Sequence, residues 1–444
     1  MVVDELGRVL RRSASGVSVD VIAKDVAEAL ASRVVSDTTD ADILWATLPT
    51  LHEAATPNRR LRPGLEYPRD VILRSGLVGP RLLHVGHVVG LMNTVNEVLA
   101  LRPVLDEVAH RLGGQPQLLR SAALQSTDVI ESWKRCTRLE HGLRAEAKLI
   151  GITLDPGSLR RRLLKASRAR TLLHHAHQRG EFRTLLVSNQ HLSDHRAALH
   201  SSHEHGVSTL YIPHAPVASN DLYHDLPVNS AALRGDLEVD YYSKLGARHD
   251  RLHSVGNPAV PPLDPPPCLY GPIVLALSPW SHDRMRAFIN LVRDGIGTQT
   301  NIVVAPHPRN SRKEVRRLLP DGWSINSGRT LDLLAEGPRL LIQHSSGIAW
   351  EGLYLGIPTI QIQMDDEGPN YPLISEPFVQ TVRSAQELRD ASTTPSKDLD
   401  RAELRDWAHR WCAAVGVVAA RRVVDLIEDM PEDPELILDA WSLP

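Results

Sequence analysis

Short apolar segments alternate with helix-like segments between residues 273 and 363, and this alternation constrains the fold more than any other feature of the chain. The apolar segments are too short for helices, so we predict strands at residues 273–277, 301–305, 323–325, 339–343 and 359–363. The helices predicted between them span residues 283–293, 313–319, 331–334 and 346–355. Alternation of this kind is typical of a parallel sheet that is covered by helices on both faces.

Prolines crowd residues 257–267, a stretch that can therefore be neither a helix nor a central strand and that divides the chain in two. The segment before it shows the same alternation, with strands predicted at 184–187, 207–212, 239–242 and 253–255 and a helix at 194–205. Further upstream we expect strands at 41–48 and 71–73, and mainly long helices over 80–149.

These patterns predict an α/β fold of two Rossmann-like domains that face each other across a cleft, the first with a helix-rich N-terminal half. Residues 404–427 are amphipathic, which indicates one closing helix packed across both domains. The predicted divisions are a first domain with a helical insertion (1–257), a linker (258–270), a second domain (271–403) and a closing helix and tail (404–444).

The composition argues against nucleic acid as a partner. The formal charge is −3, from 50 basic and 53 acidic residues, and only 4% of residues are aromatic, so a basic surface and stacking platforms are both scarce. Three cysteines without a close pair predict a reducing compartment, and no apolar leader or membrane-spanning run is seen, so we predict a cytoplasmic protein. The arginines within 160–170 are typical of a solvated helix face; they could also contact an anionic acceptor or lipid head groups at the inner face of a membrane.

Two motifs in the second half place anion-binding groups at the ends of predicted strands. The sequence HPR at 307–309 follows one strand, and SSG at 345–347 follows another and opens a helix. A helix N-terminus offers free amide groups and the positive end of its dipole, and a neighbouring strand end adds the positive charge of a histidine and an arginine. The residues that we predict to bind phosphate are His307, Arg309, Ser345, Ser346 and Gly347.

Further polar residues near the same edge would complete a nucleotide site. Glu351 lies on the helix that SSG opens, where its carboxylate can accept a hydrogen bond from a ribose hydroxyl. Ser278, Asn326 and Ser327 each follow a predicted strand. Because the carboxyl ends of parallel strands share one edge of a sheet, we predict that these four residues contact the ribose and the base.

In this order, the HP motif, a strand, SSG, a helix with a glutamate and LGIPTI resemble GT-B transferases that use cytidine nucleotides: bacterial sialyltransferases, Kdo transferases of capsule assembly and CDP-glycerol glycerophosphotransferases. The resemblance covers roughly residues 180 to 380 and implies that His307, Ser345 and Ser346 hold the phosphate of CMP. The segment SSGIAWEGLYLGIPTI also resembles the non-hydrolysing UDP-GlcNAc 2-epimerases, which implies a ribose-binding role for Glu351. By this resemblance the first domain is the acceptor side and the second binds the donor.

This sequence departs from the pattern of the family at the residues that would supply the general base. The acidic motif that supplies the base in bacterial sialyltransferases has no clear counterpart in the first half. The sequence DDEG at 365–368 has the right letters but lies in the second half. His214-Ala215 replaces the usual His-Gly turn at the end of the strand 207–212. We favour His214 as the base, since a histidine titrates near neutral pH. Its rivals are Asp194, His191, Asp221 and Asp225.

No metal or other cofactor is expected. The sequence has no DxD-like pair at a strand end, and the histidines at 174–177 and 200–205 lack carboxylate or cysteine partners at a recognisable spacing, the latter on a helix that we expect to be exposed. The predicted function is a metal-independent transferase that moves a sugar or glycerol phosphate from a cytidine nucleotide to a glycan, lipid-linked or metabolite hydroxyl, as in polysaccharide biosynthesis. Alternatives are a UDP-sugar transferase or 2-epimerase-like enzyme, and a non-catalytic nucleotide-sugar-binding protein.

Overall fold

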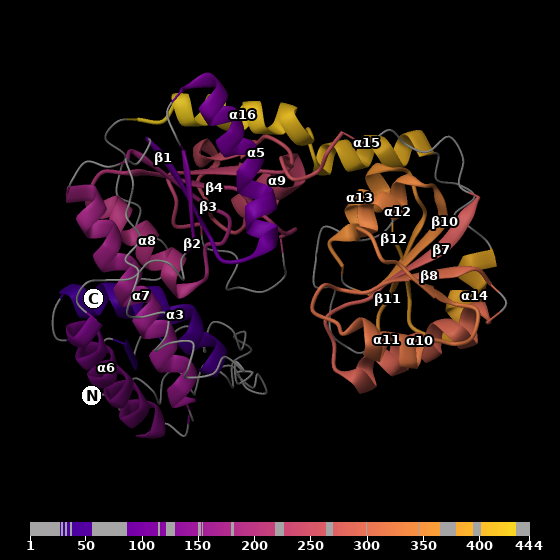
Figure 1. Cartoon of the computed structure of the whole chain (residues 1–444), viewed down its shortest axis with the longest axis horizontal. Helices are drawn as coiled ribbons and strands as arrows, with labels where there is room; N and C mark the ends of the chain where they lie inside the picture. Colours follow the sequence, from indigo (N-terminus) through magenta and orange to yellow (C-terminus); the bar gives the residue numbers. More distant parts are fainter. Residues whose placement is uncertain are drawn as a thin grey trace.

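Two parallel sheets, each covered by helices on both faces, form two domains that are joined along one side (Figure 1). This confirms the predicted α/β architecture. The computed structural model describes residues 27, 30–31, 33–35, 38–55, 87–113, 116–120, 129–149, 152, 154–178, 182–217, 226–262, 270–298, 300–344, 346–364, 379–393 and 401–431. Of the sequence predictions, Ser345, Asp221, Asp225, the strand 71–73 and the acidic segment 365–368 lie outside the described residues.

The sheet of the first domain has the order β2-β1-β3-β4-β5-β6, and every neighbouring pair is parallel. Its strands are β1 (Val88–Met92), β2 (Gln117–Arg120), β3 (Thr184–Val187), β4 (Ser208–Tyr211), β5 (Ser230–Leu233) and β6 (Leu252–Ser254). Its helices are α3 (Thr38–Ala55), α5 (Val95–Arg111), α6 (Val129–Leu149), α7 (Pro156–Gln178), α8 (Ser193–Glu204) and α9 (Asp236–Lys244), with a short 3-10 turn, η3 (His249–Arg251).

Several predictions for this domain are wrong. Residues 41–48 lie in α3, which contacts α7 and α8. Residues 42–48 are buried on every side of the helix, so their apolar pattern loses the helical period. Residues 239–242 belong to α9, which buries Glu238, Val239 and Tyr242 on one helical face. The segment 80–149 holds two strands, β1 and β2, as well as helices, and β5 is a further strand that the sequence pattern did not predict.

The sheet of the second domain has the order β12-β11-β10-β7-β8-β9 and is also parallel throughout. Its strands are β7 (Gly271–Ala276), β8 (Ile302–Ala305), β9 (Ser324–Ile325), β10 (Pro338–Gln343), β11 (Thr359–Ile362) and β12 (Val379–Val382). Its helices are α10 (His282–Ile296), α11 (Arg312–Leu318), α12 (Thr330–Ala335), α13 (Ile348–Tyr354) and α14 (Ala385–Thr393). Each strand and helix predicted between 273 and 363 is present. The strands β7, β8, β10 and β11 are largely buried and read as continuous apolar runs, whereas β9 is a short edge strand whose Ser324 is exposed.

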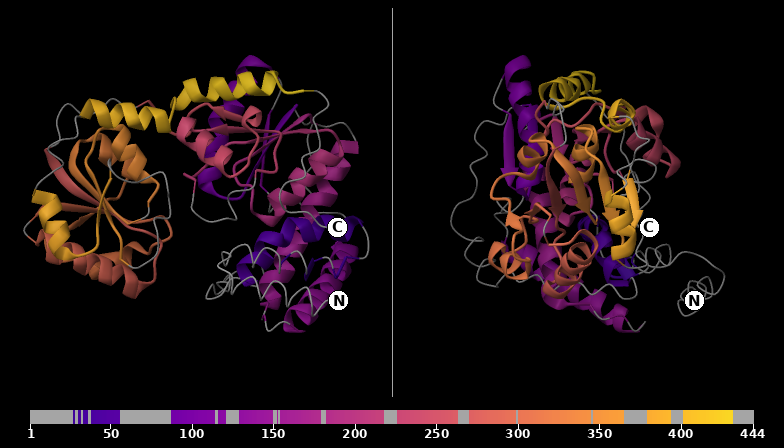
Figure 2. Two further views of the ribbon diagram at one scale, coloured as in Figure 1. Left: turned by 180° about the vertical axis from the view of Figure 1, so that it is seen from behind. Right: turned by 90° about the vertical axis from the view of Figure 1, so that its right-hand side faces the viewer.

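The closing segment is two helices and not the single helix predicted. Helix α15 (Arg401–Trp411) packs on α13 of the second domain, and α16 (Gly416–Glu428) returns to α5 of the first, so that together they cross both domains (Figure 2). Ala420, Val423, Val424 and Ile427 of α16 belong to the core of the first domain.

The chain breaks between these helices because it pairs there with the first domain. Asn257 donates its amide hydrogen to Ala414 O at 2.8 Å, and Gly416 donates to Asn257 O at 3.1 Å.

No helix in the described part of the chain is long and apolar enough to cross a membrane.

Candidate functional site

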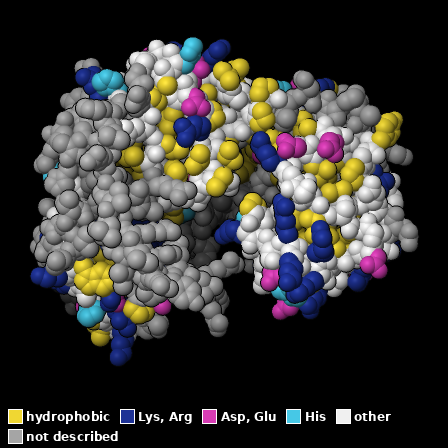
Figure 3. Space-filling model, viewed as in Figure 1, with side chains coloured by type: hydrophobic (Ala, Val, Ile, Leu, Met, Phe, Trp, Pro, Cys, Tyr) yellow, Lys and Arg dark blue, Asp and Glu magenta, His cyan; other side chains and the backbone are white. Residues whose placement is uncertain are grey.

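The order of the strands locates a candidate site in each sheet. In an open parallel sheet, a crevice forms at the carboxyl edge where the order of strands reverses. That point lies between β1 and β3 in the first sheet and between β7 and β10 in the second. On the face that Figure 3 shows, a hollow opens between the two domains.

In the second domain, the loops after β7 and β10 meet at the reversal point. The ring of Trp280 lies edge-on to His344, 4.6 Å between centroids. Ser278 is 3% exposed, and its Oγ has no hydrogen-bond partner among the described residues. An unsatisfied buried hydroxyl at this edge is a candidate contact for a ligand.

His307 and Arg309 follow β8, which is separated from β10 by β7. The HP and SSG motifs are therefore not on neighbouring strands as predicted, and at about 4.8 Å per strand their starting points are roughly 10 Å apart. Arg309 donates its amide hydrogen to His307 Nδ1 at 3.1 Å, so a neutral His307 carries its proton on Nε2. Burial, and next the charge of Arg309, lower the pKa of His307 below 6.5. This histidine can donate a hydrogen bond at neutral pH but does not supply the positive charge that we predicted.

The amide of Ser346 is already engaged and is not one of the free donors predicted at this helix start. It donates to Gln343 Oε1 at 2.7 Å, and Gln343 Nε2 donates in turn to Gln361 at 3.2 Å. The next residue, Gly347, faces the first domain: a Cβ built on it would lie 3.1 Å from Cδ of Pro216. Glycine at this position therefore permits the two domains to touch.

The carboxyl group of Glu351 is buried at the same boundary. Its Oε2 has no hydrogen-bond partner within the described chain, and burial raises the pKa of Glu351 to about 7, against the smaller effect of Arg234. Arg234 follows β5 of the first domain, so the carboxyl group predicted to bind ribose faces the opposite domain.

The last predicted contacts lie at the margin of the sheet. Asn326 and Ser327 follow β9, the outermost strand. The Asn326 side chain is bonded within its own turn, donating to Gly328 O at 3.2 Å and accepting from Gly328 N at 3.0 Å. Arg312 donates to Ser327 O at 2.9 Å.

In the first domain, the reversal point holds a buried polar network that the sequence did not predict. Asn93 follows β1 and donates from Nδ2 to Asp194 Oδ2 at 3.1 Å. The other oxygen of Asp194 lies 3.3 Å from His195 Nδ1, and His195 Nε2 lies 3.9 Å from Glu97 Oε2. Glu97 also accepts from the amides of Asn93 and Thr94, which completes a capping box at the start of α5. Asp194 is thus a buried member of a network, 2% exposed.

His214 follows β4, beside this network. Its Nδ1 contacts the carbonyl oxygen of Ser188, which can only accept, so Nδ1 carries the proton and Nε2 is left with a free lone pair. The pKa of His214 is lowered, chiefly by burial and further by Arg234 and His195, against the effects of Ser188 and Glu97. At neutral pH the ring is accordingly an uncharged base. Its rival His191 is also uncharged, because burial lowers its pKa to about 3.

Arg234 is a further charged residue at the domain boundary that sequence reasoning missed. Arg234 directly follows β5, the strand that pairs with β4, and it is near enough to His214 for its charge to act on that ring. The side chain is 2% exposed, and its Nη1 is 3.5 Å from Glu238 Oε1. Its charge lowers the pKa of both His214 and Glu351.

One sequence signal could have revealed part of the first-domain network. Thr94 and Glu97 have the spacing of a capping box directly after the apolar run VVGLM, which marks a strand followed by a helix. The helix that carries the histidines 200–205 is buried and not exposed as predicted, since the residues 193–199 and 201–203 are all covered.

Comparisons with known proteins agree with the fold. The sequence matches no protein-family model and no curated protein sequence. The structure resembles a UDP-GlcNAc 2-epimerase from Methanocaldococcus jannaschii, with a TM-score of 0.50 and 11% identity over 77% of this chain and 99% of that one. It also resembles the glycotransferase of kitacinnamycin, with a TM-score of 0.51 and 13% identity over 79% of this chain and 100% of that one. The chain has the GT-B fold. An epimerase and a transferase share this fold, so the chemistry has to be argued from the site.

Proposed function

We propose that the protein is a GT-B glycosyltransferase that moves a sugar, or glycerol phosphate, from a cytidine nucleotide to a hydroxyl group without a catalytic metal. The observation that carries this proposal is the position of His214. Its Nε2 lone pair is unprotonated, and two residues later Pro216 meets Gly347 of the second domain. A general base therefore stands where the acceptor-side domain touches the donor-side domain.

In the proposed reaction, His214 Nε2 takes the proton of the acceptor hydroxyl while the hydroxyl oxygen bonds to the transferred carbon or phosphorus atom. The bond from that atom to the nucleotide phosphate breaks, and the nucleotide leaves with the electron pair. His307 Nε2–H and the exposed Arg309 are donors for the negative charge that builds on it, and Ser278 adds a buried hydroxyl. Glu351 accepts a hydrogen bond from the ribose.

The cytidine assignment is supported by the order of the HP and SSG motifs in the sequence. A UDP-sugar-dependent transferase or epimerase is a second candidate, favoured by the structural likeness to the 2-epimerase from Methanocaldococcus jannaschii. A nucleotide-sugar-binding protein without catalysis is a third, since the donor side could bind without a working base.

A thermal-shift series with CMP, CDP, UMP, UDP and GDP separates these candidates. A ligand at 100 times its Kd adds about 2.7 kcal/mol to the free energy of unfolding. We expect the largest shift with a cytidine nucleotide; a largest shift with UDP would replace our donor by the second candidate.

A variant of the proposed base tests for catalysis. His214→Ala should keep the thermal shift and lose turnover, with the exposed His249→Ala as control. No turnover by the parent protein with any donor would leave the third candidate.

A further inference from the structure

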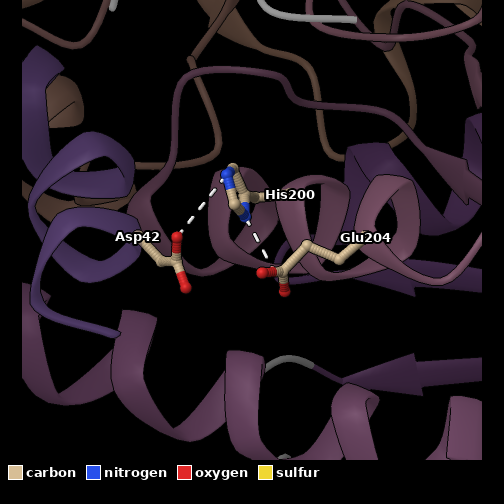
Figure 4. A group of neighbouring side chains, drawn as sticks. All are labelled: Asp42, His200 and Glu204. Carbon is tan, nitrogen blue, oxygen red and sulfur yellow. Dashed lines mark ion pairs between the residues drawn. The ribbon is translucent and has the colours of Figure 1, made fainter. Parts of the chain in front are cut away.

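Three side chains of the kinds that bind metal ions converge between α3 and α8, away from the site described above (Figure 4). Asp42 comes from α3, and His200 and Glu204 lie one turn apart on α8. One ligand atom from each of the three lies within 4.8 Å of the other two. Figure 4 shows the imidazole between the two carboxylates: its Nε2 is 3.6 Å from Asp42 Oδ1, and its Nδ1 is 3.9 Å from Glu204 Oε2.

Arg170 of α7 holds both carboxylates from the other side. Its Nε donates to Asp42 Oδ2, and its Nη2 lies 3.5 Å from Glu204 Oε1. The remaining oxygens, Asp42 Oδ1 and Glu204 Oε2, are the ones turned toward His200. Carboxylates that bind metals are commonly fixed by such a partner on their second oxygen.

The imidazole is fixed in place but incompletely satisfied. The ring of His200 packs against Trp45 at 5.3 Å between centroids, and Arg196 stacks on the same indole at 3.9 Å. Nδ1 of His200 is buried and has no hydrogen-bond partner in the part of the chain that the structure describes. Glu204 is the most exposed of the three ligands, with 32% of its side chain accessible, so it can turn onto the nitrogen that faces Asp42.

We propose that Asp42, His200 and Glu204 bind one divalent transition-metal ion of the zinc type. One nitrogen and two oxygen ligands suit Zn²⁺ with water in the fourth position, whereas Mg²⁺ and Ca²⁺ prefer oxygen alone. His200 lies about 9 Å along α8 from Asp194, at 1.5 Å per residue, so the ion cross-links α3 to α8 and takes no part in transfer. The site is independent of the proposed function, and either can fail without the other.

The test uses the full chain, stripped with EDTA and titrated at pH 7.5 with ZnCl₂ in a calorimeter and with CoCl₂ by visible absorption. The chain has 21 histidines, so weak background binding is expected and the comparison between variants decides. His282→Ala is the matched control, because His282 also has a carboxylate nearby, Asp283 Oδ1 at 3.6 Å, but belongs to no such three-residue group among the described residues.

We expect one site per chain whose affinity falls about 100-fold in His200→Ala and roughly 10-fold in Glu204→Gln, with His282→Ala unchanged. Zn²⁺ should raise the melting temperature of the parent and of His282→Ala but not that of His200→Ala. Glu204→Gln changes an accessible side chain, so it tests the site even if His200→Ala fails to fold. Equal binding by the parent and Glu204→Gln, or no one-to-one site in the parent, would overturn the proposal and leave these side chains as ion-pair partners of Arg170.

Discussion

His214 Nδ1 is bonded to the carbonyl oxygen of Ser188, and this bond decides which nitrogen of the imidazole can accept a proton. The pKa of His214 is lowered from 6.5. Most of the imidazole is therefore already in its uncharged, basic form at pH 6.5. We expect kcat at saturating donor, which does not depend on donor affinity, to rise with pH along a limb whose apparent pKa lies below 6.5, and to level off by about pH 7. A limb centred above pH 6.5 in the pH–rate profile would show that another group is the base.

Glu351 should make nucleotide affinity depend on pH. Its pKa is raised to about 7, so the carboxylate form, which we propose accepts from ribose, becomes more populated as the pH rises through 7. We expect Kd for the nucleotide to fall between pH 6 and pH 8. Glu351→Gln should weaken binding at pH 8 by about 10-fold, the worth of one charge-assisted hydrogen bond, and remove the pH dependence. The exposed Glu336→Gln is the control; calorimetry that finds the same pH dependence in Glu351→Gln would rule out this role.

Buried histidines should make the fold sensitive to acid. Burial lowers the pKa of His177 to about 3 and that of His203 to about 4, so both stay neutral in the folded chain while the unfolded chain takes up protons below about pH 6.5. The unfolded state then binds more protons, and stability falls as the pH drops from 6.5 toward these values. At pH 5 each histidine should lower the free energy of unfolding by about 2 kcal/mol relative to pH 7.

Urea titrations of His203→Gln measure this effect, because glutamine can keep a hydrogen bond to Thr209, whose Oγ1 is 3.0 Å from His203 Nε2. Its stability should change less between pH 7 and pH 5 than that of the parent. The exposed His282→Gln should behave as the parent does. Identical pH slopes for all three proteins would contradict the assignment.

Gly256 should be intolerant of any side chain. It has φ +112°, and a Cβ there would lie 2.1 Å from Ala414 O, in the backbone that joins the two closing helices. We expect Gly256→Ala to lower the free energy of unfolding by roughly 2 to 4 kcal/mol, from strain and overpacking together. Gly246 has φ +97° but open space around it, so Gly246→Ala should cost only about 1 to 2 kcal/mol. Equal losses for the two variants in urea denaturation would mean that the contact with Ala414 adds nothing.

The sequence predicted the second domain well and the first domain poorly, for physical reasons. Strands such as Ile302–Ala305 are apolar on both faces and stand out between polar helices. Val88–Met92 is equally buried, but the chain around it is apolar as well, so its boundaries disappear. Ser230–Leu233 begins with three small residues that have little strand propensity, and its pairing with β4 and β6 forms the strand.

Some residues of the candidate site could be predicted from the sequence and others could not. His307, Gly347 and Glu351 belong to local motifs that can be seen in the sequence. Asn93 and Asp194 meet only because β1 pairs with β3, which brings together residues about one hundred positions apart. Short motifs carry no trace of such a pairing. The capping box at Thr94 is the exception, since a helix start is itself a local event.

The return of α16 to the first domain sets an order of events during synthesis. Val423, Val424 and Ile427 complete a hydrophobic core that also contains Val88 and Leu101. These two residues are translated more than three hundred residues earlier. The second sheet and its helices, by contrast, come from one continuous stretch that is translated entirely before α16. The domain that is translated second can therefore finish folding first, while the earlier one keeps an uncovered face until α16 is made.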